Sequence, residues 1–130
     1  MKKPSILSKL VSAIIPHKYS KENQKAAEES MQSLRSRMDI LCQKAQNLED
    51  TYAEQRTQIE ECAKTFFAIE PSASVRAGKF EQQIAVAITS VSSELDKIFT
   101  TQDPKALNSE IKLLVRVIRE RQNADIPQDE

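Results

Sequence analysis

The stretch AEESMQSLRSRMDILCQKAQNLEDTYAEQRTQIEECAKTFFAI, residues 27–69, decides the fold expected for this chain. Steps of alternately four and three residues along it give thirteen positions, of which all but Gln55 are apolar. This spacing is typical of a helix that buries one seam against another helix. We therefore expect one coiled-coil-type helix of about fifty residues, ending before Pro71 because a residue that precedes proline disfavours helical geometry. The thirteen positions are Ala27, Met31, Leu34, Met38, Leu41, Ala45, Leu48, Tyr52, Gln55, Ile59, Cys62, Phe66 and Ile69.

The composition of the 130-residue chain also favours helices and leaves room for one domain. Glycine occurs once and tryptophan is absent. Because tight β-turns and phosphate-binding loops need residues at positive φ, so little glycine argues against β-sandwiches, barrels and such loops. Lys+Arg and Asp+Glu number 19 each, so no net charge attracts nucleic acid or acidic substrates.

Two shorter amphipathic segments follow the long one. Asp103 and Pro104 mark the start of the second, as an N-cap carboxylate and the first helical residue. Gly78 leaves the start of the first open, since residues 72–77 either begin it or form a separate helical turn. Both segments carry apolar residues on more than one side, so each is expected to have more than one neighbour. Their apolar positions are Phe80, Ile84, Ala87, Ile88, Val91, Leu95 and Ile98, and then Leu107, Ile111, Leu114 and Ile118.

The expected fold is all-α, with a long coiled-coil-type helix folded back onto two shorter helices and a short amino-terminal amphipathic helix. The long helix would measure about 70 Å and the next about 35 Å, so a three-helix bundle forms at one end only. The uncovered seam must still be buried, because each such side chain stabilises by ~1.5–3 kcal/mol on leaving water. The third helix, the amino-terminal segment or a second chain could cover it, and we favour a second chain. The expected seam residues are Met31, Leu34, Met38, Leu41, Leu48 and Tyr52.

Residues 5–15 separate polar from apolar side chains completely when placed on a helix. One interpretation is an amphipathic helix in a membrane interface, with flanking lysines on anionic lipid. The other is a fourth helix docked on the bundle or on the seam. Pro16 is expected to end this segment and Ser20 to cap the next helix. The residues that could contact a membrane are Ile6, Leu7, Leu10, Val11, Ile14, Ile15, Lys2, Lys3 and Lys9.

These patterns divide the chain into three parts. Residues 1–19 are a basic amphipathic segment, residues 20–122 a helical coiled-coil or bundle domain, and residues 123–130 a disordered acidic tail. Cys42 and Cys62 would lie about 30 Å apart on one helix, too far for an intramolecular disulfide. They are expected to be reduced thiols, or bonded to a second chain.

Residues that could carry catalysis are few. His17 is the single histidine, and no zinc motif, Cys-x-x-Cys pair or glycine-rich loop occurs. We therefore expect no enzyme activity, no cofactor or metal and no small-molecule substrate.

The last helix carries a stripe of basic residues, with acidic residues beside it that reduce its charge. Basic residues near a helix carboxy terminus are expected from the helix dipole alone. The members of the stripe are Lys105, Lys112, Arg116 and Arg119.

The favoured hypothesis is a non-catalytic interaction or scaffold module that self-associates, or pairs with another coiled coil, through the seam. The second is a peripheral membrane protein anchored by residues 5–15; the two are compatible, because a dimer presents two anchors. A nucleic-acid-binding or regulatory protein that uses the basic stripe ranks below both. Because no secretion signal and no run of ~18 apolar residues occurs, the expected location is the cytoplasm, with or without a membrane surface.

Overall fold

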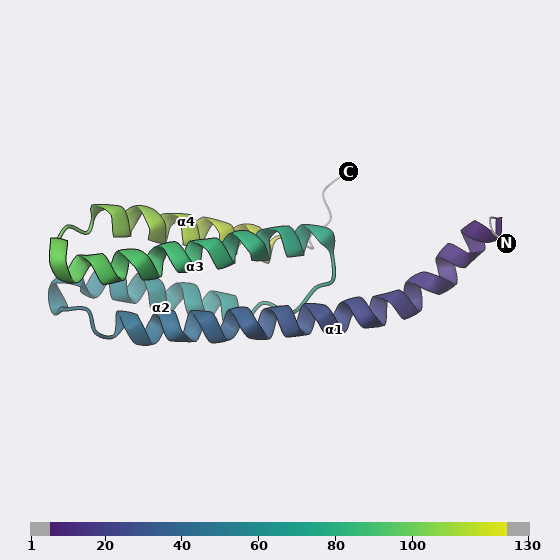
Figure 1. Ribbon diagram of the computed structural model, residues 1–130, viewed down its shortest axis with the longest axis horizontal. Helices are drawn as coiled ribbons and strands as arrows, with labels where there is room; N and C mark the ends of the chain where they lie inside the picture. The colour runs from purple at the N-terminus through teal and green to yellow at the C-terminus, as the bar shows by residue number, and fades with distance from the viewer. Residues whose placement is uncertain (1–5, 125–130) are drawn as a thin grey trace.

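The computed structural model describes residues 6–124, and side chains from Glu22 to Ala124. The described residues form helices and no strand, which confirms the all-α fold (Figure 1). A short 3-10 turn at Asp50–Tyr52 precedes the second helix. The helices are α1 (Ile6–Ala45), α2 (Ala53–Phe67), α3 (Val75–Thr101) and α4 (Lys105–Gln122).

The four helices form a bundle in which α1 packs on α2 and α3, and α4 packs on the same two helices. Hydrogen bonds show that α1 and α3 run parallel, since Arg37 reaches the Ala85 carbonyl and Lys44, one heptad later, reaches that of Ser92. The pair α1 and α4 and the pair α2 and α3 therefore lie on the diagonals. The link of residues 68–74 crosses one end of the bundle to join α2 to α3 (Figure 1).

The predicted helix of some fifty residues is wrong, because the chain reverses after Ala45 and returns as α2. Leu48 and Tyr52 continue the apolar spacing but lie in the turn, where both are buried. The Arg56 guanidinium donates to the Leu48 carbonyl oxygen at 2.9 Å and so closes the turn. Asn47 and Asp50 favour this reversal, since their side chains compete with the backbone for helical hydrogen bonds.

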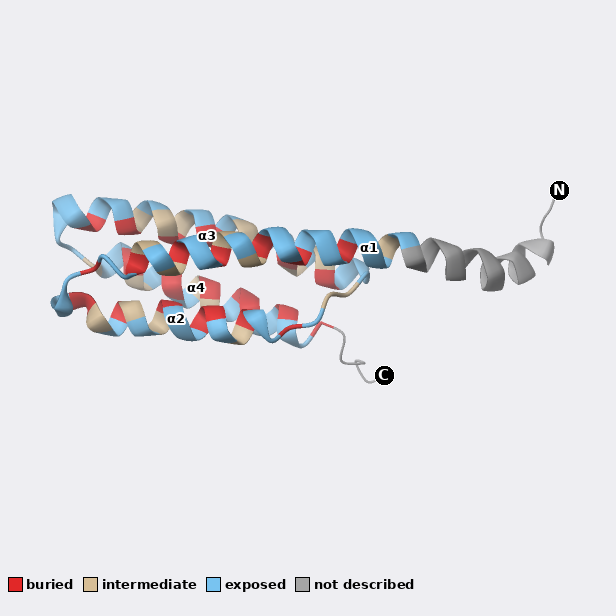
Figure 2. Ribbon diagram, turned by 90° about the horizontal axis from the view of Figure 1, so that it is seen from below, coloured by how far each residue is buried: buried red, intermediate tan, exposed pale blue. Residues whose placement is uncertain are grey.

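The reversal also covers the seam within the single chain. Met31 and Met38 are 0% exposed and Leu34 is 5% exposed. Figure 2 shows the buried residues of the helices facing one another across the bundle. The expectation of a three-helix bundle with an open seam is therefore wrong, because α2 returns along α1 and α3 runs beside it. All six seam residues are buried: Met31, Leu34, Met38, Leu41, Leu48 and Tyr52.

The two shorter helices occur where the sequence predicted them. Helix α3 begins after Ser74, whose hydroxyl accepts from the Ala77 backbone N–H at 3.0 Å, and it continues through Gly78 without a separate turn. The carboxylate of Asp103 accepts from the Lys105 N–H at 3.1 Å, so it satisfies an amino-terminal donor of α4. The predicted N-cap at Asp103 and first helical residue at Pro104 are each one residue too early, because Pro104 is the N-cap and α4 begins at Lys105.

Helix α1 passes through Pro16 and Ser20 without a break, so the expected end at Pro16 and cap at Ser20 are wrong. A proline inside a helix removes one backbone donor and bends the helix, which does not have to end there. The proposed membrane-contact residues lie outside the part whose side chains are described. Of the tail predicted to be disordered, residues 123–130, the structure describes Asn123 and Ala124, which form a turn after α4 with Ala124 buried. Residues 125–130 lie outside the described residues.

A buried ion pair joins the helices at the end of the bundle opposite the α1–α2 turn. The Arg121 Nε donates to the Glu81 carboxylate at 2.7 Å, and their side chains are 2% and 6% exposed. Ser30 of α1 donates to the same carboxylate at 3.2 Å, and Arg121 also donates to the Glu70 carbonyl oxygen at 2.8 Å. One cluster therefore ties α1, α3, α4 and the link after α2 together.

Breaking this pair from one side should destabilise the fold. The Glu81→Gln variant leaves the buried Arg121 charge without its carboxylate, and we expect the free energy of unfolding to fall by about 3–5 kcal/mol. Replacing both residues (Glu81→Leu with Arg121→Met) should cost less than the single change, because no buried charge remains. Urea denaturation followed by circular dichroism measures both effects. A double variant less stable than Glu81→Gln would contradict the argument.

Candidate functional site

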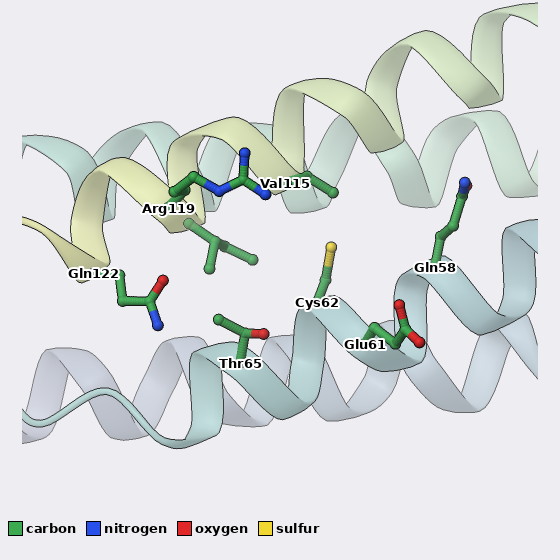
Figure 3. A pocket seen from close by; sticks show the side chains of 8 residues that line it. Gln58, Glu61, Cys62, Thr65, Val115, Arg119 and Gln122 are labelled. Carbon is green, nitrogen blue, oxygen red and sulfur yellow. The ribbon is translucent and has the colours of Figure 1, made fainter.

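The candidate site is the groove between α2 and α4. Two adjoining clefts of about 270 and 320 Å³ lie along it, and both are lined by Gln58 and Val115. Figure 3 shows the first cleft, with the Cys62 side chain pointing from α2 toward α4. Ile111 and Ile118 contribute from the α4 side, and both are buried. We call these two clefts and their walls the α2–α4 groove.

Parallel packing of α2 and α4 sets the register of the groove. Gln55, the one polar position of the heptad pattern, is buried, and its amide donates to the Asn108 side-chain oxygen at 2.9 Å. This bond places each residue of α2 beside a residue 53 positions later in α4. Gln55 therefore sets the alignment of α2 with α4.

The walls of the groove carry opposite charges. Glu54 and Glu61 line it from α2, and Lys112 and Arg119 line it from α4. The members of each pair are seven residues apart, about 10 Å along a helix, so each wall presents its charges on one side. None of the ion pairs formed by described residues joins α2 to α4. The groove therefore has an acidic wall and a basic wall that do not neutralise each other by direct contact.

The groove between α1 and α3 is different, because its own side chains bridge it. Arg37 of α1 donates to the Thr89 hydroxyl of α3 at 2.7 Å. Lys44 pairs with Asp96 at 2.8 Å and donates to the Ser92 hydroxyl at 2.7 Å. The polar side chains between α1 and α3 therefore bond mainly to each other. The charged side chains of the α2–α4 groove form no ion pairs across it, so they remain available to contact another molecule.

The cysteines lie on two antiparallel helices rather than on one, so their predicted separation along a single helix is wrong. Both are free thiols in the structure. Burial, followed by the influence of Cys42 and of Glu61, raises the pKa of Cys62 to about 11. Burial and then Asp39 and Glu60 raise the pKa of Cys42. Because the thiolate is the reactive form, this arrangement disfavours nucleophilic chemistry near neutral pH.

The sequence-predicted residues distribute unevenly over the structure. The six seam residues lie in the core and none lines the groove. All four members of the basic stripe are exposed, but only Lys112 and Arg119 line the groove. Glu54, Glu61 and the buried Arg121 were missed as site or core residues. The seven-residue spacing of Glu54 and Glu61 is the signal that could have identified the acidic wall.

Metal binding and membrane crossing bear on function. Among the described side chains, from Glu22 to Ala124, no group of three or more His, Cys, Asp or Glu could hold a metal ion. Within residues 6–124, no helix is long and apolar enough to cross a bilayer. Comparison of the chain with protein-family models, curated proteins and solved structures finds no match.

The raised pKa of Cys62 predicts slow alkylation of the folded protein. At pH 8 its thiolate fraction should be lower than that of an ordinary cysteine by about two orders of magnitude. Iodoacetamide labelling, quantified by peptide mass spectrometry, should show Cys62 reacting slowest in the native protein and both cysteines reacting rapidly in urea. Equal rates for Cys62 in native and unfolded protein would contradict the prediction.

Proposed function

We propose that this chain is a non-catalytic interaction protein that attaches to membrane surfaces through the amino-terminal part of α1. The observation that carries the proposal is the length of α1, which has 40 residues against 27 in α3. Ser30 of α1 contacts Glu81 of α3 through a hydrogen bond of 3.2 Å. Helix α3 begins at Val75, six residues before Glu81. Because α1 and α3 run parallel, residue 24 of α1, six residues before Ser30, lies at about the same height along the bundle axis as the start of α3.

The part of α1 before this level is helical from Ile6. Its sequence supplies the second support, because residues 5–15 place serines and Lys9 on one arc and only apolar residues on the other. A helix of this composition is suited to lie in a membrane interface, with its apolar arc among the lipid chains. Five lysines and no acid in residues 1–21 would add attraction to anionic headgroups.

Continuity with the bundle favours this mode of attachment. An isolated helix of eleven residues is marginal in water, because forming its first turn is costly. In this chain the segment extends a helix whose later residues are already held by the core, from Ala27 onward. Membrane binding would then use a segment that is already helical and continuous with the part of α1 held by the core. The proposed location is accordingly the cytoplasmic side of a membrane surface.

Self-association is the second candidate function. The seam no longer supports it, because all six seam residues leave water within one chain. The charged walls of the α2–α4 groove are the observation that favours it. Nucleic-acid binding ranks below both, because the acidic wall of α2 lies across the groove from Lys112 and Arg119.

Vesicle flotation tests membrane attachment. We expect the full chain to float with phosphatidylcholine vesicles that contain about one-third phosphatidylserine. The variant Leu10→Ser with Ile14→Ser removes apolar area without changing charge and should reduce binding at least tenfold, since each side chain contributes ~1.5–3 kcal/mol.

The matched control is Ser8→Gln with Ser12→Gln, which changes the polar arc and should retain binding. Circular dichroism should show that both variants keep the helical content of the bundle. Equal recovery of the two variants with the vesicles would contradict the proposal, and so would full binding by a chain that lacks residues 1–16.

A further inference from the structure

We propose that the α2–α4 groove is a self-association surface, on which a second copy of this chain packs in parallel about a two-fold axis that runs along the groove. This inference goes beyond membrane attachment and does not depend on it. It rests on the pattern of charge along the two walls and on the lack of bridging ion pairs between them.

The charges that matter are exposed. Glu54 and Glu61 on α2 are exposed, as are Lys105 and Lys112 on α4. None of these four belongs to an ion pair among the described residues. Glu54, Glu61 and Lys112 line the groove, and Lys105 lies two turns before Lys112 on the same face of α4. Each copy therefore carries two acids on α2 and two bases on α4 toward the same side of the bundle.

A two-fold axis parallel to the helices places α2 of one copy over α4 of the other without changing the level of any residue. Because of the Gln55–Asn108 bond, a residue of α2 lies at the same height along the bundle axis as the residue of α4 that is 53 positions later in the sequence. Glu61 then lies within two residues, or about 3 Å, of the level of Lys112 in the second copy. Glu54 lies equally close to the level of Lys105. Symmetry doubles both contacts, so each acid meets a base.

The alternative face-to-face arrangement is disfavoured by the same charges. An axis that crosses the helices would stack α2 on α2 and α4 on α4. Glu54 and Glu61 would then face acids, and Lys112 would face bases. Because like charges brought together destabilise an interface, the pattern selects the parallel arrangement.

The character of the interface follows from its composition. Half-buried Val115 and Gln58 lie between the charged rows, and packing of a second copy would cover the two clefts beside them. The chain has 19 bases and 19 acids, so two copies approach without net repulsion. Exposed ion pairs are weak and are screened by salt. We therefore expect a salt-sensitive dimer with a Kd on the order of 10 μM.

The parallel arrangement has a consequence for the proposed function. It would bring the amino-terminal ends of both α1 helices to the same end of the dimer. Two amphipathic segments could then meet one membrane, and their binding would be strengthened by effective concentration. Only this consequence rests on membrane attachment.

Charge exchange across the interface tests the proposal by sedimentation velocity at low salt. The unchanged chain should be a dimer at about 100 μM, roughly tenfold above the expected Kd. The variants Glu61→Lys and Lys112→Glu should each be monomeric at that concentration, because each places like charges in contact. An equimolar mixture of the two should recover the dimer, since every contact then joins opposite charges. The control variants Lys25→Glu and Glu28→Lys, which are exposed on α1, should remain dimeric.

A monomeric unchanged chain, dimeric single variants or a mixture that stays monomeric would each overturn the proposal. The double variant Glu61→Lys with Lys112→Glu in one chain provides a second readout, because it should dimerise with itself. Vesicle flotation of the monomeric variants separates the two proposals. These variants should still bind vesicles, although more weakly than the dimer, if residues 5–15 attach to the membrane. Changing Leu10 and Ile14 to serine should abolish vesicle binding whether the chain is a monomer or a dimer.

Discussion

Removal of the apolar stripe of residues 27–69 from water is the constraint on which the remaining structure depends. A straight helix of that length would extend beyond its shorter neighbours and leave part of the stripe exposed to solvent. The chain instead reverses between Ala45 and Ala53, and the two halves of the stripe cover each other. Helices α3 and α4 then complete the core. Because the link after α2 crosses the bundle end, α2 and α4 become parallel neighbours, and the charged groove between them is a result of this topology.

The sequence predicted the helical class and both shorter helices, because their apolar spacing and the signals at Asp103 and Pro104 are local. It could not reveal the reversal, since Leu48 and Tyr52 keep the heptad spacing through the turn and no glycine or proline marks it. The polar Asn47 and Asp50 were the available signals, and both are tolerated within helices. Periodicity records which residues are buried, and it does not record whether the partner is another chain or the same chain folded back.

The groove and the buried ion pair were beyond local patterns for a different reason. Lys112 was visible as part of a basic stripe, but the identity of its neighbouring helix depends on how the two hairpins pack. Arg121 resembled an ordinary carboxy-terminal base, although it is 2% exposed and pairs with Glu81 from another helix. The roles of Lys112 and Arg121 depend on which helices pack together and how those helices are aligned, which local sequence patterns do not specify. A self-contained core also changes the expected mode of interaction, from burial of an apolar seam to contacts made by polar surfaces and by the amino-terminal helix.

The most direct test of the account is an intrachain distance between spin labels at Gln32 and Lys64, which are exposed and lie 32 residues apart. Pulsed electron paramagnetic resonance would be applied to labelled protein diluted with unlabelled chain, in a Cys42→Ser, Cys62→Ala background. Reversal into a hairpin predicts a main distance of about 20 Å, because Lys64 then lies beside α1. A distance of about 48 Å, the span of one uninterrupted helix, would contradict the account.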